Sequence, residues 1–128
     1  MRQGKAQSYE DLEVYRLAKQ CAVEVHRMTL DKLPRFEMYE EGAQIRRSAK
    51  SIVANIVEGF GMRRYKGDFV RYLTIALASC DETKAHLELL YEYGSLNKER
   101  FEYFMERYRM LGAKIYNFRE AVIRGHKT

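Results

Sequence analysis

Two stripes of residues with α-helical spacing constrain the fold of this chain more than any other feature. The first alternates steps of four and three residues without interruption: Phe69, Leu73, Ala76, Cys80, Thr83, Leu87 and Leu90. The second is equally regular: Phe101, Phe104, Tyr108, Leu111, Ile115, Phe118 and Val122. Largely apolar side chains at this spacing share one face of a helix, and that face must be buried against other helices. The two stripes therefore predict a bundle with antiparallel neighbours.

Two more helices are predicted before these stripes. Apolar side chains recur at helical spacing from Val14 to Met28 and from Ile45 to Phe60, and Pro34 disfavours helix between the two segments. We therefore predict an all-α fold, an antiparallel up-down-up-down four-helix bundle that forms a single domain over residues 1–128. Its helices are expected at about 9–29, 40–60, 68–93 and 98–124.

Short motifs predict where these helices begin and end. A capping motif that starts at Ser8 is expected to begin the first helix, and the second helix is expected to begin between residues 37 and 43. Gly59 and Gly61 are expected to end the second helix with a left-handed cap, and Gly94 is expected to end the third. The connections that result are short, which favours antiparallel packing of consecutive helices.

Positive charge is concentrated in one part of the sequence. Residues 44–71 contain seven lysines and arginines but only two acids, so this segment alone matches the formal net charge of the chain, +5. The seven cations are Arg46, Arg47, Lys50, Arg63, Arg64, Lys66 and Arg71. On a helix, the first three would surround Ala54 and Val57 on an outer face. Such a surface is suited to the phosphates of RNA or DNA, although uneven solvated charge is also common on helical proteins.

Small polar residues border the core face of the second predicted helix. We expect a hydrogen-bonded network that sets the register of the second and third helices, because buried polar groups need partners. Its expected members are Gln44, Ser51, Asn55, Glu58, Ser79 and Glu82, with Ser48 and Thr83 nearby. The alternative is that this stripe lines a subunit or ligand interface.

The sequence contains no arrangement typical of an enzyme or a metal centre. His26, His86 and His126 fall in different segments, without a second ligand at metal-binding spacing. The segment "GFGMRR" follows a helix instead of a strand and lacks the third glycine of a dinucleotide-binding loop. We therefore expect a non-enzymatic protein with no catalytic residue, no metal and no cofactor.

Cysteine usage and hydropathy indicate the compartment. Cys21 and Cys80 occupy core positions of predicted helices and form no CxxC motif, as expected of buried thiols in a reducing environment. The N-terminal segment has no apolar core of a signal peptide, and no run of about 18 apolar residues would span a membrane. We expect a cytoplasmic protein that does not associate with membranes.

Three segments together carry a family resemblance: "YEDLEVYRLA", "QIRRSAKSIVANIVEGFGMRR" and "KGDFVRYLTIALAS", followed by Glu82. They resemble the small bacterial four-helix bundle proteins called the S23 or 23S rRNA intervening-sequence protein family. The resemblance covers residues 9–96, weakens in the last helix, and is most specific from Ser51 to Gly59. Two positions depart from the family pattern: Gly42 stands where a threonine cap is usual, and Val57 where alanine is frequent. The pattern carries over to Gln44, Arg47, Ser51, Asn55, Glu58 and Gly59.

The resemblance implies an oligomer more clearly than it implies a role. Such proteins are encoded in intervening sequences within 23S rRNA genes of some bacteria, and elsewhere in many genomes. A related branch comprises accessory proteins of diversity-generating retroelements, which form barrel-shaped homopentamers and bind nucleic acid and a reverse transcriptase. By similarity, we expect a homopentamer of four-helix bundles.

Two functional hypotheses follow. In the first, the chain is an oligomeric binding module that contacts structured RNA or DNA phosphates through the seven cations named above. In the alternative, it is a protein-interaction scaffold or accessory subunit with no nucleic-acid role. The basic face and the ten tyrosines would then serve protein contacts, because tyrosine is amphipathic and common at interfaces.

Overall fold

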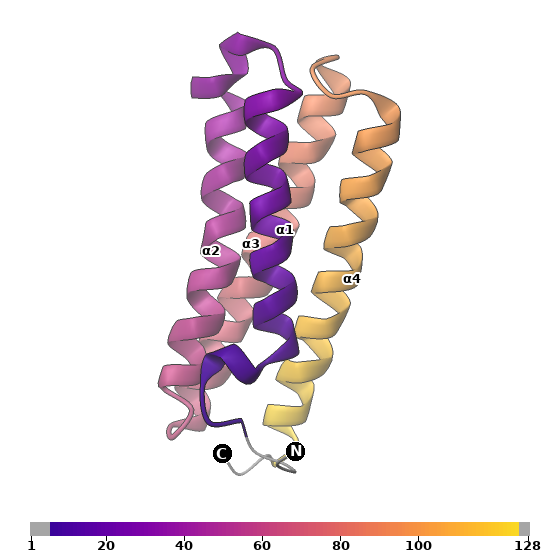
Figure 1. Cartoon of the computed structure of the whole chain (residues 1–128). Helices are drawn as coiled ribbons and strands as arrows, with labels where there is room; N and C mark the ends of the chain where they lie inside the picture. The colour runs from indigo at the N-terminus through magenta and orange to yellow at the C-terminus, as the bar shows by residue number, and fades with distance from the viewer. Residues whose placement is uncertain (1–5, 126–128) are drawn as a thin grey trace.

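The computed structural model describes residues 6–125, which form four long α-helices and two short 3₁₀ helices (Figure 1). Consecutive α-helices run antiparallel and pack against each other, and α4 returns to pack against α1. The predicted all-α, antiparallel four-helix bundle is confirmed, and no strand occurs among residues 6–125. The elements are η1 (Tyr9–Asp11), α1 (Glu13–Asp31), η2 (Arg35–Tyr39), α2 (Glu41–Gly61), α3 (Lys66–Glu92) and α4 (Lys98–Ile123).

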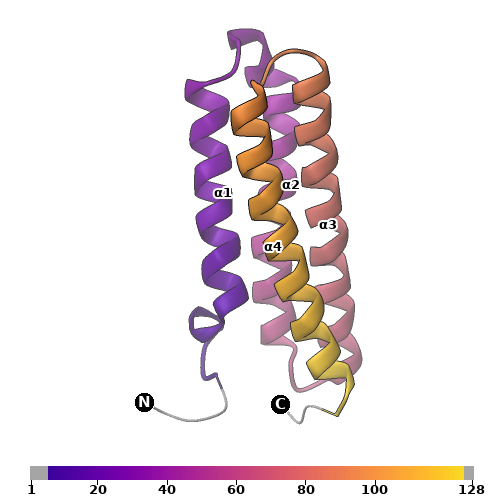
Figure 2. The same ribbon diagram turned by 90° about the vertical axis from the view of Figure 1, so that its right-hand side faces the viewer.

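The bundle places α1 and α3 at diagonal corners. Within the described part of the chain, α1 packs against α2 and α4 and not against α3. Figure 2 shows α4 in front, with α1 and α3 on either side of it. The α1–α2 and α3–α4 connections lie at the upper end of the molecule in Figure 1. The α2–α3 turn therefore lies at the opposite end, together with η1 and the last turn of α4.

The stripe on α3 forms the centre of the core, as its spacing predicts. All seven of its side chains are at most 1% exposed. In α4, Tyr108, Leu111 and Ile115 are buried to the same degree. Complete burial of one large aliphatic side chain contributes about 1.5–3 kcal/mol, so these stripes supply much of the driving force for folding. Cys21, Val25, Ile45, Ile52 and Ile56 complete the core from α1 and α2.

The first α-helix begins later than the sequence predicts. Ser8 and Asp11 do form a capping box: Ser8 Oγ accepts the Glu10 N–H at 3.1 Å, and Asp11 Oδ2 accepts the Ser8 N–H at 3.1 Å. This box starts the three-residue η1, however, and not α1. Leu12 follows in an extended conformation and buries its side chain in the core, so α1 starts at Glu13.

A buried carboxylate organises the connection between α1 and α2. Glu37 is 1% exposed; its Oε1 accepts the Glu41 N–H at 3.1 Å, and its Oε2 accepts the Ser95 hydroxyl at 2.6 Å. Glu37 therefore joins η2 both to the first turn of α2 and to the α3–α4 turn. A Cβ atom on Gly42 would clash with the Glu37 carbonyl oxygen, which explains why glycine occupies this position.

The glycines near the end of α2 do not act as predicted. Gly94 has φ +82° and ends α3 in the left-handed conformation, which confirms that prediction. Gly59 and Gly61 have no positive φ and lie within α2, so the prediction of a left-handed cap there is wrong. Gly59 instead allows close packing, because a Cβ atom there would lie 3.0 Å from Tyr72 Cβ on α3.

Candidate nucleic-acid interface

Paired hydroxyl groups hold α2 against α3 and position the outer surface of α2. Ser48 Oγ lies 2.8 Å from Thr83 Oγ1, and Ser51 Oγ lies 2.8 Å from Ser79 Oγ. Asn55 Nδ2 donates to the Ser51 carbonyl oxygen at 2.8 Å. Ser48 and Thr83 also donate to carbonyl oxygens of their own helices, but a one-turn slip of either helix would break both pairs and remove the partner of the buried Ser79 hydroxyl. The pairs therefore favour a single helix register.

Three residues expected in this network lie outside it. Gln44 and Glu58 are exposed on α2, and neither side chain forms a hydrogen bond to α3 among the described residues. Glu82 is also exposed, with its Oε2 atom 3.4 Å from His86 Nε2. The other ring nitrogen of His86 lies 2.6 Å from Glu41 Oε1, so this histidine links α3 to the first turn of α2. Sequence reasoning did not find the histidine bridge, because its partners are 45 residues apart.

An outer stripe runs along α2 and into the α2–α3 turn. Positions 47, 50, 54, 57, 61 and 64 alternate steps of three and four residues, which places the helical members on one side of α2. Arg47 and Lys50 lie toward one end, and Arg64 and Lys66 lie at the other. All four are exposed, and none forms an ion pair with a carboxylate among residues 6–125. These four cations are called the open cations below.

Arg46 does not belong to this outer surface. Its guanidinium is half-buried: Nη1 donates to Thr29 Oγ1 at 2.8 Å, and Nη2 donates to the Met38 carbonyl oxygen at 2.6 Å. The expectation that Arg46 lies on the outer face is therefore wrong. One residue turns a helix by about 100°, so Arg46 points toward α1 when Arg47 points to solvent. Its bonds close the corner between α1, η2 and α2.

Arg63 and Arg71 border the α2–α3 turn. The guanidinium of Arg63 lies 4.0 Å from the centre of the Phe60 ring and donates to the Phe60 carbonyl oxygen at 3.0 Å. Arg71 is exposed, with a long contact of 3.7 Å to Asp68 within α3. Tyr65, between the cations of the turn, is 57% exposed. An exposed aromatic ring flanked by cations is suited to stacking on an unpaired base.

Other chemically active side chains lie away from this surface. Burial raises the pKa of the Cys21 and Cys80 thiols to about 11, so both stay protonated near neutral pH and are poor nucleophiles. Within residues 6–125, no group of three or more His, Cys, Asp or Glu side chains is placed to hold a metal ion. His126 lies outside the described residues. None of the helices in this part of the chain is long and apolar enough to cross a membrane.

Comparisons with known proteins agree on the family. The sequence matches the family described as 23S rRNA-intervening sequence protein over residues 10–117. A similar solved structure is that of a protein with unknown function from the S23 ribosomal protein family of Bacteroides thetaiotaomicron. The two are 25% identical with a TM-score of 0.77, and the similarity covers 84% of this chain and 95% of that chain. A comparison with curated proteins found no match. The chain belongs to the 23S rRNA-intervening sequence protein family.

Proposed function

We propose that this chain is a non-enzymatic, oligomeric binding module that contacts the phosphates of structured RNA or DNA. The observation that supports this proposal best is the accessibility of the open cations, which are exposed along α2 and at the α2–α3 turn and unpaired with carboxylates among residues 6–125. Lysine and arginine in this state release counterions from a polyanion when they bind it, which favours association. Arg71 adds charge at the rim, whereas Arg46 is committed to internal hydrogen bonds.

The length of the outer stripe suits a nucleic-acid backbone. From Arg47 to Gly61 the helix rises by about 21 Å, at 1.5 Å per residue. Phosphates of one strand recur about every 3.4 Å along a duplex, so the stripe spans roughly six of them. The residues between the cations are small, with Ala54 exposed at the centre, so a backbone can approach closely. Contacts of this kind give affinity without sequence preference.

Crosslinking to an RNA hairpin with photoreactive bases in its loop tests where the contact lies. We expect crosslinked peptides from residues 47–66, with Tyr65 as the main site because its ring is exposed between cations. A DNA hairpin of the same sequence serves as a parallel ligand and reports any preference for RNA. Crosslinks confined to α1 or α4 would contradict the proposed location.

We also propose that the chain forms a homo-oligomer, with five copies as the number expected from the family resemblance. Exposed apolar side chains on α3 support self-association: Ile75 and Leu89 are each 37% exposed, with Ala78 and Ala85 between them. They lie opposite the core face, and a helix that is apolar on two faces favours burying both. A ring would repeat the basic surface and strengthen weak contacts through multivalency. Light scattering that gives only the mass of one chain, 15.2 kDa, would contradict this part of the proposal.

A further inference from the structure

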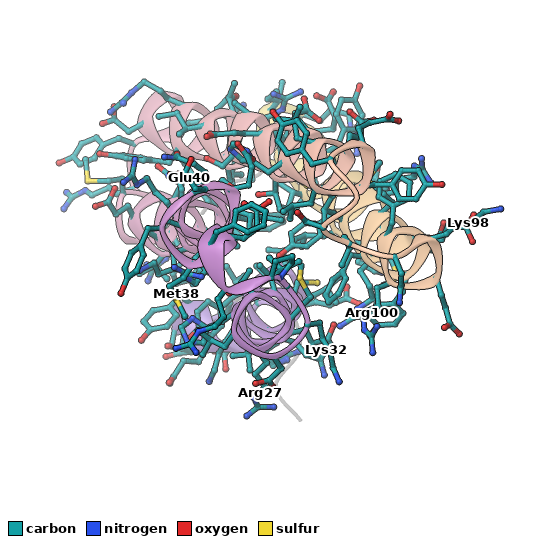
Figure 3. All side chains as sticks on the ribbon, turned by 90° about the horizontal axis from the view of Figure 1, so that it is seen from above. Arg27, Lys32, Met38, Glu40, Lys98 and Arg100 are labelled. Atoms are coloured by element: carbon teal, nitrogen blue, oxygen red, sulfur yellow. The ribbon has the colours of Figure 1, made fainter. Side chains whose placement is uncertain are left out.

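A trough follows the line between α1 and α4 on the surface of the bundle. Its lower part has a volume of about 810 Å³ and is lined by nine residues of α1 between Glu13 and Arg27, together with Met110 and Lys114 of α4. Its upper part, of about 530 Å³, shares Glu24 and Arg27 with the lower part. It continues to Lys32 and Arg100, which lie side by side at the upper end (Figure 3). The two parts form one trough nearly as long as α1, or about 28 Å.

The lower part of the trough combines exposed apolar side chains with uncompensated positive charge. Val23 and Met110, from opposite walls, are 40% and 39% exposed. Arg16, Lys19 and Arg27 line the same part and form no ion pair with a carboxylate among the described residues. Both acids there are already paired, each at 3.2 Å: Glu13 with Lys114, and Glu24 with Arg107. The remaining acids of the trough, Asp31 and Glu99, line only its upper part.

The outer face of α3 has complementary properties. Its exposed centre contains the apolar residues Ile75, Ala78, Ala85 and Leu89. Glu82, Glu88 and Glu92 are exposed along the upper half of the same helix, whereas its exposed arginine, Arg71, lies near the lower end. The three glutamates span about 15 Å along the helix axis, and Arg16 and Arg27 span about 16 Å. Charge and length therefore match between the α3 face and the trough.

We propose that the outer face of α3 in one copy of this chain docks in the α1–α4 trough of a second copy. This inference rests on the proposed homo-oligomer and assigns the two surfaces that join its subunits. Burial of Ile75 and Leu89 against Val23 and Met110 removes apolar surface from water and supplies the apolar contact. The glutamates of α3 then meet the arginines of α1, which fixes the register of the two subunits.

The position of the two surfaces on the bundle determines what repeated docking builds. Each copy offers one α3 face and one trough, so the contact is heterologous and every copy can bind two neighbours. Because the trough lies between α1 and α4, and α4 is also a neighbour of α3, the two surfaces do not point in opposite directions. Repeated docking therefore follows a curved path instead of a straight one, and the proposed homo-oligomer requires that this path closes into a ring. The outer stripe of α2 belongs to neither surface and stays available for nucleic acid.

Charge-swap variants test this pairing by light scattering at low salt. One variant reverses the charge of the trough (Arg16→Glu with Arg27→Glu), and another reverses the charge of the α3 face (Glu88→Lys with Glu92→Lys). We expect each to weaken association by roughly a hundredfold, at about tenfold for each reversed charge. A chain that carries all four substitutions should recover the oligomer, because the pairs are restored with opposite sign. Mixing the two variants should also restore association, because the native α3 face of one fits the native trough of the other, and the two charge-reversed surfaces fit each other.

In the control variant, Arg47 and Lys50 on α2 are replaced with glutamate. Its oligomer should have the same mass as that of the unmodified protein. Circular dichroism verifies that every variant remains helical. If the unmodified protein is oligomeric but the charge-swapped chain stays dissociated, the assigned surfaces are wrong and the proposed homo-oligomer stands. If the unmodified protein is monomeric at all concentrations, the proposed homo-oligomer and this inference both fail. The proposed contact with phosphates is tested independently by crosslinking.

Discussion

Replacing the four open cations, Arg47, Lys50, Arg64 and Lys66, with glutamate is expected to abolish binding to an RNA or DNA duplex. Each reversal removes one favourable phosphate contact and adds a repulsive charge. At roughly tenfold for each reversed position, the combined loss is about 10⁴-fold in the dissociation constant. Fluorescence anisotropy with a labelled duplex at low salt measures this loss, and helicity should not change because all four side chains are exposed.

A second variant with four substitutions distinguishes the contribution of the open cations to binding from that of the total charge. Arg35, Lys98, Arg109 and Arg124 are also exposed but lie outside the outer stripe of α2. Replacing these four with glutamate changes the net charge by the same amount. We expect this control to weaken binding by less than about tenfold, since only long-range attraction is lost. Equal losses in the two variants would mean that binding depends on overall charge alone.

Gly42→Ala is expected to destabilise the fold more than the same change at Gly59 or Gly61. The added Cβ would clash with the Glu37 carbonyl oxygen, and backbone atoms in a buried connection cannot move aside easily. Overpacking of this kind costs about 3 kcal/mol, which lowers the midpoint of thermal unfolding by roughly 10 °C for a chain of this size. Thermal unfolding followed by circular dichroism measures the shift.

Gly61→Ala provides the matched control for this change. Gly61 is also in α2, but it is exposed, and a Cβ atom there would meet nothing within 4 Å. Alanine should therefore stabilise the helix by about 0.5–1 kcal/mol, because glycine loses more conformational freedom on folding. If Gly42→Ala unfolds at the same temperature as Gly61→Ala, the packing of Glu37 against Gly42 does not have the role assigned to it.

The helices were predictable because their determinants are local and repeated. In α3, seven core positions at regular spacing fix both the helix and its buried face, and all seven are buried as expected. The end of α3 at Gly94 was equally predictable, since a glycine that follows a long helical stripe commonly adopts a left-handed conformation. The same glycine signal failed at Gly59, where the residue serves close packing against Tyr72. Sequence alone does not distinguish these two uses of glycine.

Features that depend on distant partners were not predictable in the same way. Glu37 is buried because Ser95, 58 residues later, donates to its carboxylate. Arg46 looked like its neighbour Arg47, but Thr29 and the Met38 carbonyl oxygen remove it from the outer surface. A periodic pattern identifies the face of a helix. The burial and the hydrogen-bond partners of a polar side chain on that face depend on which other elements pack against it.

One wall of the trough corresponds to a pattern in the sequence that does not by itself predict a binding surface. Positions 16, 20, 23 and 27 of α1 alternate steps of four and three residues, the spacing of a helix face. Their mixture of charged and apolar side chains is also typical of an ordinary solvated surface. The α1 pattern is identified as one wall of a trough only in the structure, where Met110 on α4 lies on the opposite wall.

The salt dependence of binding to a DNA duplex tests the central claim most directly, namely that the open cations contact phosphates. Four such contacts predict that the logarithm of the binding constant falls with the logarithm of salt concentration at a slope of about −3.6 for each protomer engaged. Affinity should then decrease roughly a hundredfold between about 50 and 200 mM salt. A slope near zero, or the same slope for the variant in which the four open cations are replaced with glutamate, would contradict the account.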